Sequence, residues 1–513
     1  MAQQVIVIGA GVAGLATAGL LEREGYEVTV VEKNDEVGGR AGQLRVDGFR
    51  FETGPSWYLM PDAFDHFFEL MGTTTAEELD LVALDPAYRL FPEGQDPIDV
   101  PAGQRNVQRL FESIEPGAGE RLHAYLAGAA EVYQLAMDHF LYTTFERKRN
   151  LLSPVILRNL PRLAVLLLRS LESMVAAQFT DVRLRQMLTY PAVFLSGRPE
   201  KIPSMYHLMS HTDLVQGVAY PRGGFTAVVE AMASLARKHG ARFLMNTEVR
   251  AIIDDSHRAV GVRLADDSIL PADIVVSCAD LHHTETTLLA EGNRTYPQRY
   301  FDHGDPGIGT VLAFLGVRGE LPELTHHNLL FSREWGHDFD AVADGPTQQR
   351  PLGGSQSIYV CKPSTTDPLV APSGHENLFV LIPVPADPEF GYGDAYHQQA
   401  SPRIDALVDA AIEQISQWAG IPELGERVVV KRSIGPADFA ERYHAWSGGS
   451  VGPAHTLAQS AFFRASNKSV AVDGLYYAGA TVAPGVGIPM CLISAENVVK
   501  WLRGDQSTIP LAE

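Results

Sequence analysis

The feature that most constrains this chain is a set of glycines between its first predicted strand and its first predicted helix. Residues 4–8, QVIVI, form a short run of mostly β-branched apolar residues, which predicts a buried strand. Gly9, Gly11 and Gly14 follow in the spacing G-x-G-x-x-G, and residues 15–25 read as a helix. A strand, a glycine-rich turn and a helix in this order predict a Rossmann-like α/β domain that binds a dinucleotide.

Each part of this pattern has a physical task in binding a dinucleotide. Gly9 permits the tight turn, Gly11 lets a pyrophosphate approach the backbone, and Gly14 lets the helix pack closely on the strand. The N-terminus of the helix offers unpaired N–H groups and the positive end of the helix dipole to the phosphates. A second predicted strand, residues 27–32, ends at Glu32, whose carboxylate is placed to accept hydrogen bonds from a ribose.

Length, charge and cysteine content exclude several classes of protein. The chain has 513 residues, which predicts two or three domains. Its formal net charge of −21 argues against a general nucleic-acid binder, because phosphate contacts need surplus Lys and Arg. The three cysteines are far apart, so we expect inert thiols in a reducing compartment. The sequence shows neither a signal peptide nor a run near the roughly 20 apolar residues that span a bilayer.

The segment after Glu32 narrows the choice of dinucleotide. Residues 32–40, EKNDEVGGR, supply a second glycine pair and Arg40, a cation that can bind the same phosphates through two N–H groups. Residues 49–57 then read FRFETGPSW. This series resembles the FAD-binding end of the flavin oxidoreductases that include amine oxidases and carotenoid desaturases. The resemblance implies FAD rather than a dissociable nicotinamide cofactor.

Two later stretches are predicted to return to the nucleotide-binding domain. Residues 220–255 read as a turn, a helix and strands, and residues 272–280, ADIVVSCAD, predict another buried strand. Residues 474–502 read as a strand, a glycine-rich turn and a helix, which brings backbone N–H groups to the polar parts of the flavin chain. We therefore expect an α/β fold with a discontinuous Rossmann-like FAD-binding domain.

Three domains follow from this interpretation. The FAD-binding domain is predicted to comprise residues 1–75, 220–290 and 470–513. A mixed-sheet substrate domain is predicted from residues 76–100, 205–219 and 291–469. Residues 101–204 are expected to form a helical lid or membrane-contact subdomain.

The resemblance becomes more specific when motifs over nearly the whole chain are considered in order. They are YPRGG, ADIVVSCADLHHTETTLL, IYVCKPSTTDPLVAPSGHENLFVLIPVP and FFRASNKSVAVDGLYYAGATVAPGVGIPM. Together with the N-terminal pattern they resemble the bacterial-type phytoene desaturases of the carotenoid desaturase family. Carried over residue by residue, the resemblance implies that the adenosine diphosphate half of FAD is held by Gly9, Gly11, Gly14, Glu32, Gly39 and Arg40. It implies that the ribityl chain and flavin ring lie beside Gly479, Gly485, Val486, Gly487 and Ile488.

The same resemblance implies a reaction and a substrate. It implies stepwise desaturation of phytoene toward lycopene, in which a hydride passes to the flavin and a proton leaves the adjacent carbon. Oxygen or a quinone would then reoxidise the reduced flavin. A long polyene hydrocarbon has no polar handle, so its binding must come from apolar burial, at about 25 cal/mol per Å². We expect a long apolar tunnel that ends at the flavin.

Three other functions remain open on the sequence. A related carotenoid oxidase or ketolase shares the same motifs. A flavin amine oxidase would need an aromatic cage and a polar site for an amine. A non-enzymatic escort protein of the same fold would bind lipidated partners without flavin, but the intact glycine motifs favour retention of FAD.

Catalytic and metal-binding residues are harder to predict. Arg158 lies in an LRNLP stretch that resembles a family position discussed as catalytic, although it also reads as one of several interfacial cations. No proton acceptor can be chosen by spacing among so many carboxylates. His207 and His211 stand four apart, but a third ligand is not evident and flavin dehydrogenation needs no metal, so we expect no metal site.

One basic and apolar segment stands out in this acidic chain. Residues 147–171 hold six cations and no carboxylate, with a helix start at Ser153-Pro154 and a kink or a second helix expected at Pro161. On a helix, one narrow edge would carry Arg158, Arg162 and Arg169. The opposite side would carry Leu160, Leu163, Leu167 and Leu171. We expect this helix to lie on an anionic membrane, near the tunnel mouth, and the protein to be cytoplasmic and attached to the inner face of the cell membrane. The alternative is an internal helix whose arginines pair with carboxylates.

Overall fold

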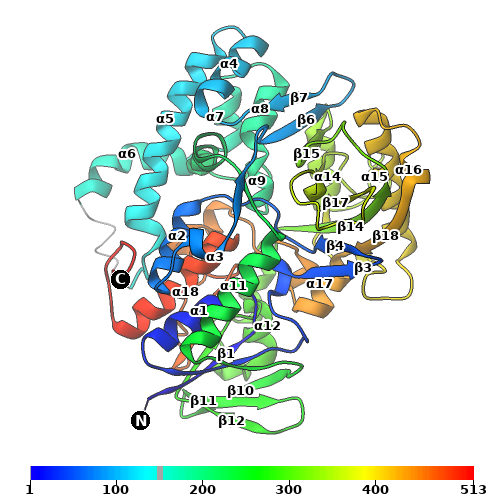
Figure 1. The fold of residues 1–513 in the computed structure, drawn as a ribbon. Helices are drawn as coiled ribbons and strands as arrows, with labels where there is room; N and C mark the ends of the chain where they lie inside the picture. The colour runs from blue at the N-terminus through cyan, green and yellow to red at the C-terminus, as the bar shows by residue number, and fades with distance from the viewer. Residues whose placement is uncertain (1, 147–153, 513) are drawn as a thin grey trace.

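The structure is a computed structural model that describes residues 2–146 and 154–512. Figure 1 shows three regions that meet at the centre of the molecule. A parallel sheet with its helices lies at the bottom of the view, a group of helices at the upper left, and a mixed sheet at the right. The chain passes between these regions several times.

The parallel sheet is assembled from distant parts of the chain. Its five strands run in the order β19-β13-β1-β2-β9, and each neighbouring pair is parallel. Their bounds are β1 (Gln4–Ile8), β2 (Glu27–Val31), β9 (Arg242–Leu244), β13 (Ile274–Ser277) and β19 (Leu475–Tyr477). Because helices cover it, its central strands are continuous apolar runs.

Three helices pack around the first strand and build this part of the core. They are α1 (Val12–Arg23), α11 (Gly224–His239) and α18 (Ile488–Arg503), and α1 lies against both others. A three-stranded antiparallel sheet extends it: β10 (Val249–Asp255), β11 (Arg258–Leu264) and β12 (Ile269–Pro271). The predicted α/β class, with a Rossmann-like sheet built from separate segments, is confirmed.

The mixed sheet has seven strands in the order β18-β14-β17-β16-β15-β6-β7. Their bounds are β6 (Tyr88–Pro92), β7 (Ile98–Val100), β14 (Ile308–Arg318), β15 (His327–Phe331), β16 (Ile358–Cys361), β17 (His375–Pro385) and β18 (Val428–Ile434). All neighbours are antiparallel except β6 and β15. Helices α14 (Trp335–Asp344) and α15 (Pro402–Ala419) pack against it, and β4 of the pair β3 (Gln43–Val46) and β4 (Phe49–Glu52) contacts β17. A second short pair, β5 (Leu81–Ala83) with β8 (Ala219–Pro221), contacts α11 through β8.

The helical group comprises α4 to α9. Its members are α4 (Gln104–Ile114), α5 (Ala118–Ala136), α6 (Pro154–Leu168), α7 (Leu171–Ala176), α8 (Val182–Thr189) and α9 (Pro191–Phe194). The short turns η4 (Ser204–Leu208), α10 (Met209–His211) and η5 (Thr212–Gln216) follow, and the first two pack against α5. Helix α6 continues through Pro161, so the expected start of a second helix there is wrong. None of the helices in the described residues is long and apolar enough to cross a membrane.

Candidate active site

A cavity of about 600 Å³ lies where the three regions meet. It is lined by the ends of strands in the parallel sheet, by the helical group and by the inner face of the mixed sheet. One part is rich in glycine and charged residues, and the other is mostly aromatic and aliphatic. We call the first part the nucleotide cleft and the second part the channel.

The glycine-rich turn forms the floor of the nucleotide cleft. Gly9 and Gly11 line it, and the Gly38 N–H donates to the Ala10 carbonyl oxygen at 2.8 Å, which holds the second glycine pair beside the first. Gly11 is the N-cap of α1, and no side chain among the described residues caps that helix end. Its first N–H groups are therefore available to an anion.

Arg40 provides the strongest sign that an anion fits this cleft. Its side chain lines the cavity, and Nε and one terminal nitrogen are buried without a partner in the described chain. A buried guanidinium with unmatched N–H groups is costly unless a ligand completes them. The positive charge of Arg40 also lowers the pKa of Asp280 and of Cys491, although burial raises both pKa values overall, and both residues line the same cavity. The residues present thus fit a diphosphate.

Glu32 occupies the position expected for the ribose partner. It lines the cleft and is 6% exposed. Its Oε2 accepts from the Ala10 N–H at 2.7 Å, and its Oε1 accepts from the backbone and side-chain amides of Asn34 at 2.8 and 2.9 Å. These bonds fix the carboxylate, whose remaining lone pairs can still accept from hydroxyls.

The other predicted cofactor residues divide into two groups. The first group lines the cavity, as Gly9, Gly11, Glu32 and Arg40 do. It consists of Gly39, Gly479, Val486, Gly487 and Ile488. Gly14 and Gly485 do not line it. A Cβ on Gly14 would lie 1.9 Å from the Gly9 carbonyl oxygen, and one on Gly485 would lie 2.3 Å from the His455 ring. Both glycines therefore permit close packing behind the cleft. That all of these predicted residues contact FAD stays a prediction.

Polar side chains that the sequence did not single out hold the second glycine-rich turn. His455 Nε2 accepts from the Val486 N–H at 3.1 Å. Asn467 donates to the carbonyl oxygens of Tyr477 and Ala483 at 3.1 and 2.9 Å. His455 and Asn467 lie outside any glycine motif, so spacing gave no signal for them.

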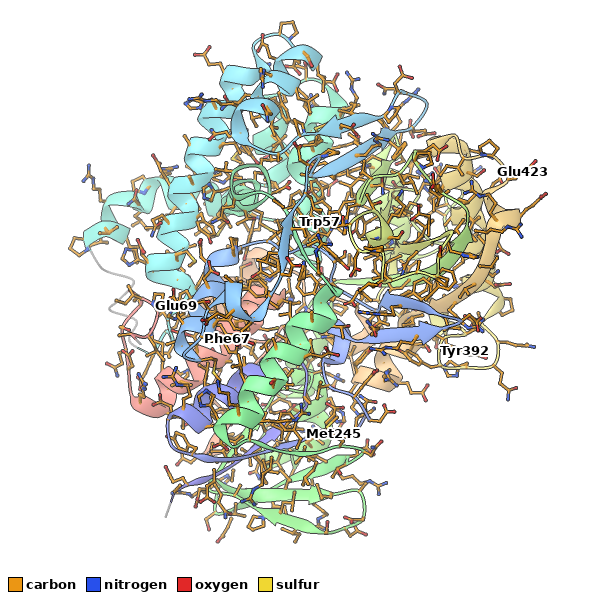
Figure 2. All side chains as sticks on the ribbon, viewed as in Figure 1. Trp57, Phe67, Glu69, Met245, Tyr392 and Glu423 are labelled. Carbon is orange, nitrogen blue, oxygen red and sulfur yellow. The ribbon has the colours of Figure 1, made fainter. Side chains whose placement is uncertain are left out.

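Trp57 is the centre of the channel's aromatic wall, and Figure 2 places it where the three regions meet. Its ring stacks on His327 with centroids 4.2 Å apart and planes 9° apart. Further rings lie around it at centroid distances of 5.6 to 6.1 Å, namely Tyr88, Tyr190, Phe194 and Tyr359. Such a wall suits a flat, apolar and polarisable ligand.

Four tyrosines that line the cavity are each hydrogen-bonded to a second titratable side chain. The pairs are Tyr133 with Asp62 at 2.7 Å, Tyr190 with Asp213 at 2.8 Å, Tyr206 with His455 at 2.7 Å, and Tyr359 with His327 at 2.6 Å. The hydroxyls therefore contribute polar points to an otherwise apolar surface.

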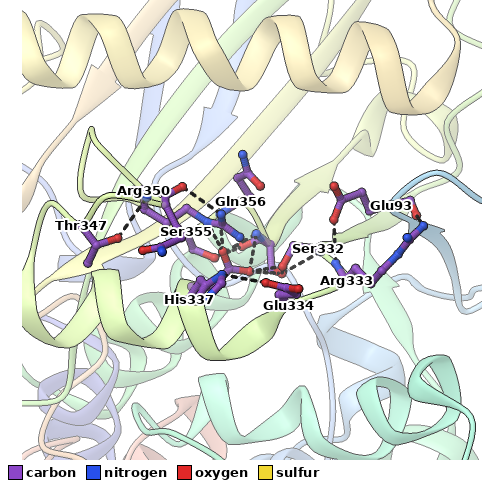
Figure 3. A network of polar contacts seen from close by, with 12 residues as sticks. Glu93, Ser332, Arg333, Glu334, His337, Thr347, Arg350, Ser355 and Gln356 are labelled. Atoms are coloured by element: carbon purple, nitrogen blue, oxygen red, sulfur yellow. Dashed lines mark hydrogen bonds and ion pairs between the residues drawn. The ribbon is translucent and has the colours of Figure 1, made fainter.

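A polar network fixes the wall of the channel beside the mixed sheet (Figure 3). Asp338 of α14 accepts hydrogen bonds from the Ser332 hydroxyl at 2.5 Å and from Arg350 Nε at 2.7 Å. The Ser357 hydroxyl and the Gln356 N–H donate to the same carboxylate at 2.6 and 3.0 Å. The network ties the loop before β16 to α14, and Asp338 and Ser357 also line the cavity.

The structure places Arg158 away from this site. It lies on an exposed part of α6, and no described residue of α6 lines the cavity. Two other lining residues, Phe145 and Ala461, are partly exposed, so the cavity comes near the molecular surface at these residues. A catalytic role for Arg158 stays a prediction that this geometry does not support.

The two histidines considered as metal ligands lie in different surroundings. His207 Nδ1 is 2.8 Å from the Ser204 carbonyl oxygen, whereas the His211 ring packs on Tyr133 at 5.1 Å.

A different group could hold a metal. In the described chain, one ligand atom each of His326, His327 and Cys361 lie within 4.8 Å of one another. Burial lowers the pKa of both imidazoles and raises that of the Cys361 thiol to about 12, so the neutral thiol is a poor ligand. The expectation that the protein needs no metal stays a prediction.

Comparison with known proteins agrees with this geometry. A family model described as flavin containing amine oxidoreductase matches residues 12–500. The chain is 37% identical to a carotenoid 3,4-desaturase of Haloarcula japonica, over 98% of each chain. It is 32% identical to a zeta-carotene-forming phytoene desaturase of Myxococcus xanthus, over 98% of this chain and 94% of the other.

A solved structure supports the fold at a greater distance. An oxidoreductase from Methanosarcina mazei superposes with a TM-score of 0.61 at 17% identity, covering 97% of this chain and 100% of the other. At that identity the likeness concerns the fold alone.

Proposed function

Because the chain belongs to the flavin-containing amine oxidoreductases and, among them, to the carotenoid desaturases, we propose that it desaturates phytoene toward lycopene in carotenoid biosynthesis. It is an FAD-dependent oxidoreductase. The observation that supports the proposed reaction best is the continuity of the cavity, which joins a cleft suited to a diphosphate to a channel walled by aromatic rings. This arrangement would bring a long polyene against the flavin end.

The nucleotide cleft contains the residues that would hold FAD. Gly9, Gly11 and the N-terminus of α1 would receive the diphosphate with Arg40, and Glu32 would bind the ribose. The turn of Val486 and Gly487 would lie beside the flavin ring. FAD, when bound, accepts the hydride that desaturation removes, and we propose oxygen or a quinone as the final acceptor.

The channel contains the features that a polyene hydrocarbon requires. Its aromatic wall around Trp57 offers apolar surface for part of a polyene chain, whose burial contributes about 25 cal/mol per Å² of apolar area. Aromatic faces also stabilise positive charge, which develops on an alkene carbon when a hydride leaves. An amine substrate would instead favour an available carboxylate beside the ring, whereas Asp338, which lines the cavity, already accepts hydrogen bonds from Ser332 and Arg350.

The proposed reaction can be tested directly. The purified protein is expected to carry flavin and to convert phytoene in liposomes into products with more conjugated double bonds, without added nicotinamide. Anaerobic assays with and without a quinone identify the acceptor. The proposal would be contradicted if the reaction depended strictly on NAD when no acceptor for the reduced flavin is present. It would also be contradicted if the flavin-loaded protein did not convert phytoene.

The 37% identity to a carotenoid 3,4-desaturase favours a second candidate, in which the substrate is a carotenoid that is already extended by conjugation. Parallel assays with phytoene and with lycopene distinguish the two. Desaturation of lycopene alone would favour the second candidate.

Access from a membrane would suit such a substrate, and α6 has a surface that fits one. Its exposed apolar side chains are Val155, Leu157, Leu160, Val165 and Leu168, with exposures between 46% and 79%. Arg158 lies on the exposed surface of the same helix. Exposed Phe462 and Phe463 lie near the cavity, since Phe145 lines the cavity and its ring is 6.3 Å from that of Phe462. Figure 1 shows α6 at the outer edge of the helical group.

The structure changes which side chains of this helix would touch lipid. Leu163 and Leu171, expected on the lipid side, are buried. Arg162 pairs with Glu131, and Arg169 donates to the Ser173 carbonyl oxygen at 2.7 Å, so these two arginines have protein partners. Residues 147–153, which include three of the cations, lie outside the described residues. We propose peripheral attachment to the anionic inner face of the cell membrane of a cytoplasmic protein, through the exposed apolar face and Arg158.

A variant of this face tests the attachment. Replacing Leu157, Leu160, Val165 and Leu168 together by serine is expected to weaken binding to anionic liposomes by at least about tenfold. Each substitution removes only part of the roughly 1.5–3 kcal/mol that full burial of a leucine or valine contributes, because these side chains are already partly covered by protein. FAD should remain bound, since α6 does not line the cavity. Ile269→Ser with Leu369→Ser, at exposed apolar positions elsewhere, is the matched control. Unchanged sedimentation of the fourfold variant would rule out this surface.

A further inference from the structure

A desaturase must remove a proton as well as a hydride, and the sequence pointed to no proton acceptor. Asp338 also lines the channel, but both of its oxygens already accept hydrogen bonds from Ser332, Arg350, Gln356 and Ser357. We therefore consider the four tyrosines of the channel that have hydrogen-bonded partners. A tyrosine hydroxyl in such a pair can accept a proton from a substrate carbon while passing its own proton to the partner. The question is which partner can receive it.

The pair of Tyr190 and Asp213 is the most deeply enclosed one with a carboxylate. Tyr190 ends α8 and is 3% exposed, and its ring lies against Trp57 and Phe194 in the channel wall. Its hydroxyl donates to Asp213 Oδ2 at 2.8 Å. Asp213, in η5, is also 3% exposed, and its Oδ1 is buried without a partner in the described chain. A buried carboxylate with an unmatched oxygen is a strong proton acceptor, because burial disfavours its charge.

The other three pairs are less suited to receive a proton. His455 Nε2 already accepts from the Val486 N–H, so the neutral ring carries its hydrogen on Nδ1 and can only donate to Tyr206. Burial holds the pKa of His327 well below its usual value, which makes it a weak base for Tyr359. Asp62 is exposed to solvent and shares its Oδ2 with Gln216, so it does not give Tyr133 an enclosed acceptor.

We propose that Tyr190 Oη is the catalytic group that takes the proton from the substrate, and that Asp213 acts through it as a positioning residue and as the final holder of the proton. This inference rests on the proposed desaturation. Hydride loss leaves an allylic cation on the substrate. The C–H bond on the adjacent carbon then breaks, its electron pair forms the new C=C bond, and its proton passes to Tyr190 Oη as the Tyr190 proton passes to Asp213 Oδ2. Because the cation is a strong carbon acid, a phenol backed by a carboxylate suffices as the base.

Asp213 has the right proton affinity for this task near neutral pH. Burial raises the pKa of its carboxyl to about 7, and the hydrogen bond from Tyr190 offsets a smaller part of that rise. The other titratable group acting on this pair is Tyr88 of β6. His211, two residues earlier, packs on Tyr133, and the charged side chains of the neighbouring α4, Arg105, Arg109 and Glu112, are exposed. We therefore expect the pH dependence to report Asp213.

The test compares Asp213→Asn and Tyr190→Phe with the parent enzyme, loaded with FAD. Both variants are expected to lower kcat by roughly 100-fold or more with little change in KM, since general-base catalysis contributes about 10² to 10⁴. In the parent, kcat should rise with pH and level off above about 7, because Asp213 must be ionised to accept the proton. Both variants should lose this acid limb. An acid limb retained in Asp213→Asn at the parent's position would overturn the proposal.

A measurement without turnover tests the same group independently. Since its pKa is raised on folding, Asp213 stabilises the fold below the unfolded value of 3.8, and this contribution is lost as the pH rises to about 7. The melting temperature of the parent should therefore fall relative to that of Asp213→Asn over this range, and a constant difference would count against the assignment. Tyr125→Phe is the control, because it removes a buried hydroxyl that does not line the cavity.

If Asp213→Asn loses FAD, Tyr190→Phe decides the kinetic question alone, and retention of its acid limb overturns the proposal. A parent that desaturates nothing would refute the proposed function, while the melting measurement would still report on Asp213.

Discussion

Gly11→Val is expected to abolish FAD binding while leaving the chain folded. A Cβ on Gly11 would meet a single described atom within 4 Å, the Gly38 carbonyl oxygen at 3.9 Å, so the protein itself has room for it. The valine would occupy the space above the N-terminus of α1, where the diphosphate must approach the backbone. We expect FAD affinity to fall roughly 100-fold or more, about 2.7 kcal/mol or more.

Flavin absorbance after gel filtration measures this retention, and circular dichroism measures the fold. Gly292→Ala is a suitable control, because Gly292 is exposed, has no described atom within 4 Å of its Cβ position and does not have a left-handed backbone. A folded Gly11→Val protein that stays fully yellow would show that the diphosphate binds elsewhere.

Gly14→Ala should have the opposite effect to Gly11→Val: it should lower the free energy of unfolding, and any change in FAD affinity should be secondary. Its Cβ would lie 1.9 Å from the Gly9 carbonyl oxygen and 3.0 Å from the Gly9 carbonyl carbon, which are backbone atoms that cannot move aside alone. Helix α1 would have to separate from β1 at the centre of the parallel sheet. We expect a loss of roughly 3 kcal/mol or more in the free energy of unfolding, which is a large part of the 5–15 kcal/mol of a typical domain.

Urea unfolding of the flavin-free protein measures this effect without help from the ligand. The midpoint for Gly14→Ala should fall well below that of the parent, whereas Gly11→Val should unfold near the parent midpoint. Equal midpoints for the parent and Gly14→Ala would mean that the close contact between α1 and the first turn is not required.

The sequence predicted the local structure around the nucleotide cleft because the residues of that structure are neighbours along the chain. The strand, turn and helix around Gly9 and Gly11 are determined by local conformation, and Glu32 follows at a fixed distance in the motif. Strand β1 and helix α18 appear where the apolar patterns place them. Burial of Arg40 with unmatched N–H groups agrees with the phosphate role that its type and position suggested.

The channel could not be predicted in the same way because its residues meet through tertiary packing. Trp57, Tyr190 and Tyr359 come from a loop, a helix end and a strand of the mixed sheet, and no spacing relates them. Asp213 lies close to His207 and His211 along the chain, yet its partner Tyr190 lies in a different element. On α6 the helical period was right, but the neighbouring helices decide which leucines are buried, and periodicity alone carries no information about those neighbours.

The strand order of the parallel sheet has a consequence for synthesis of the chain. Strand β1 needs β13 as its partner on one side, and β13 needs β19, which begins at Leu475. At elongation rates of about 5–20 residues per second, roughly 25 to 95 s pass before β19 is synthesised. During that time the apolar edge of the nascent sheet lacks its last strand, so the cofactor cleft can close only after translation is nearly complete.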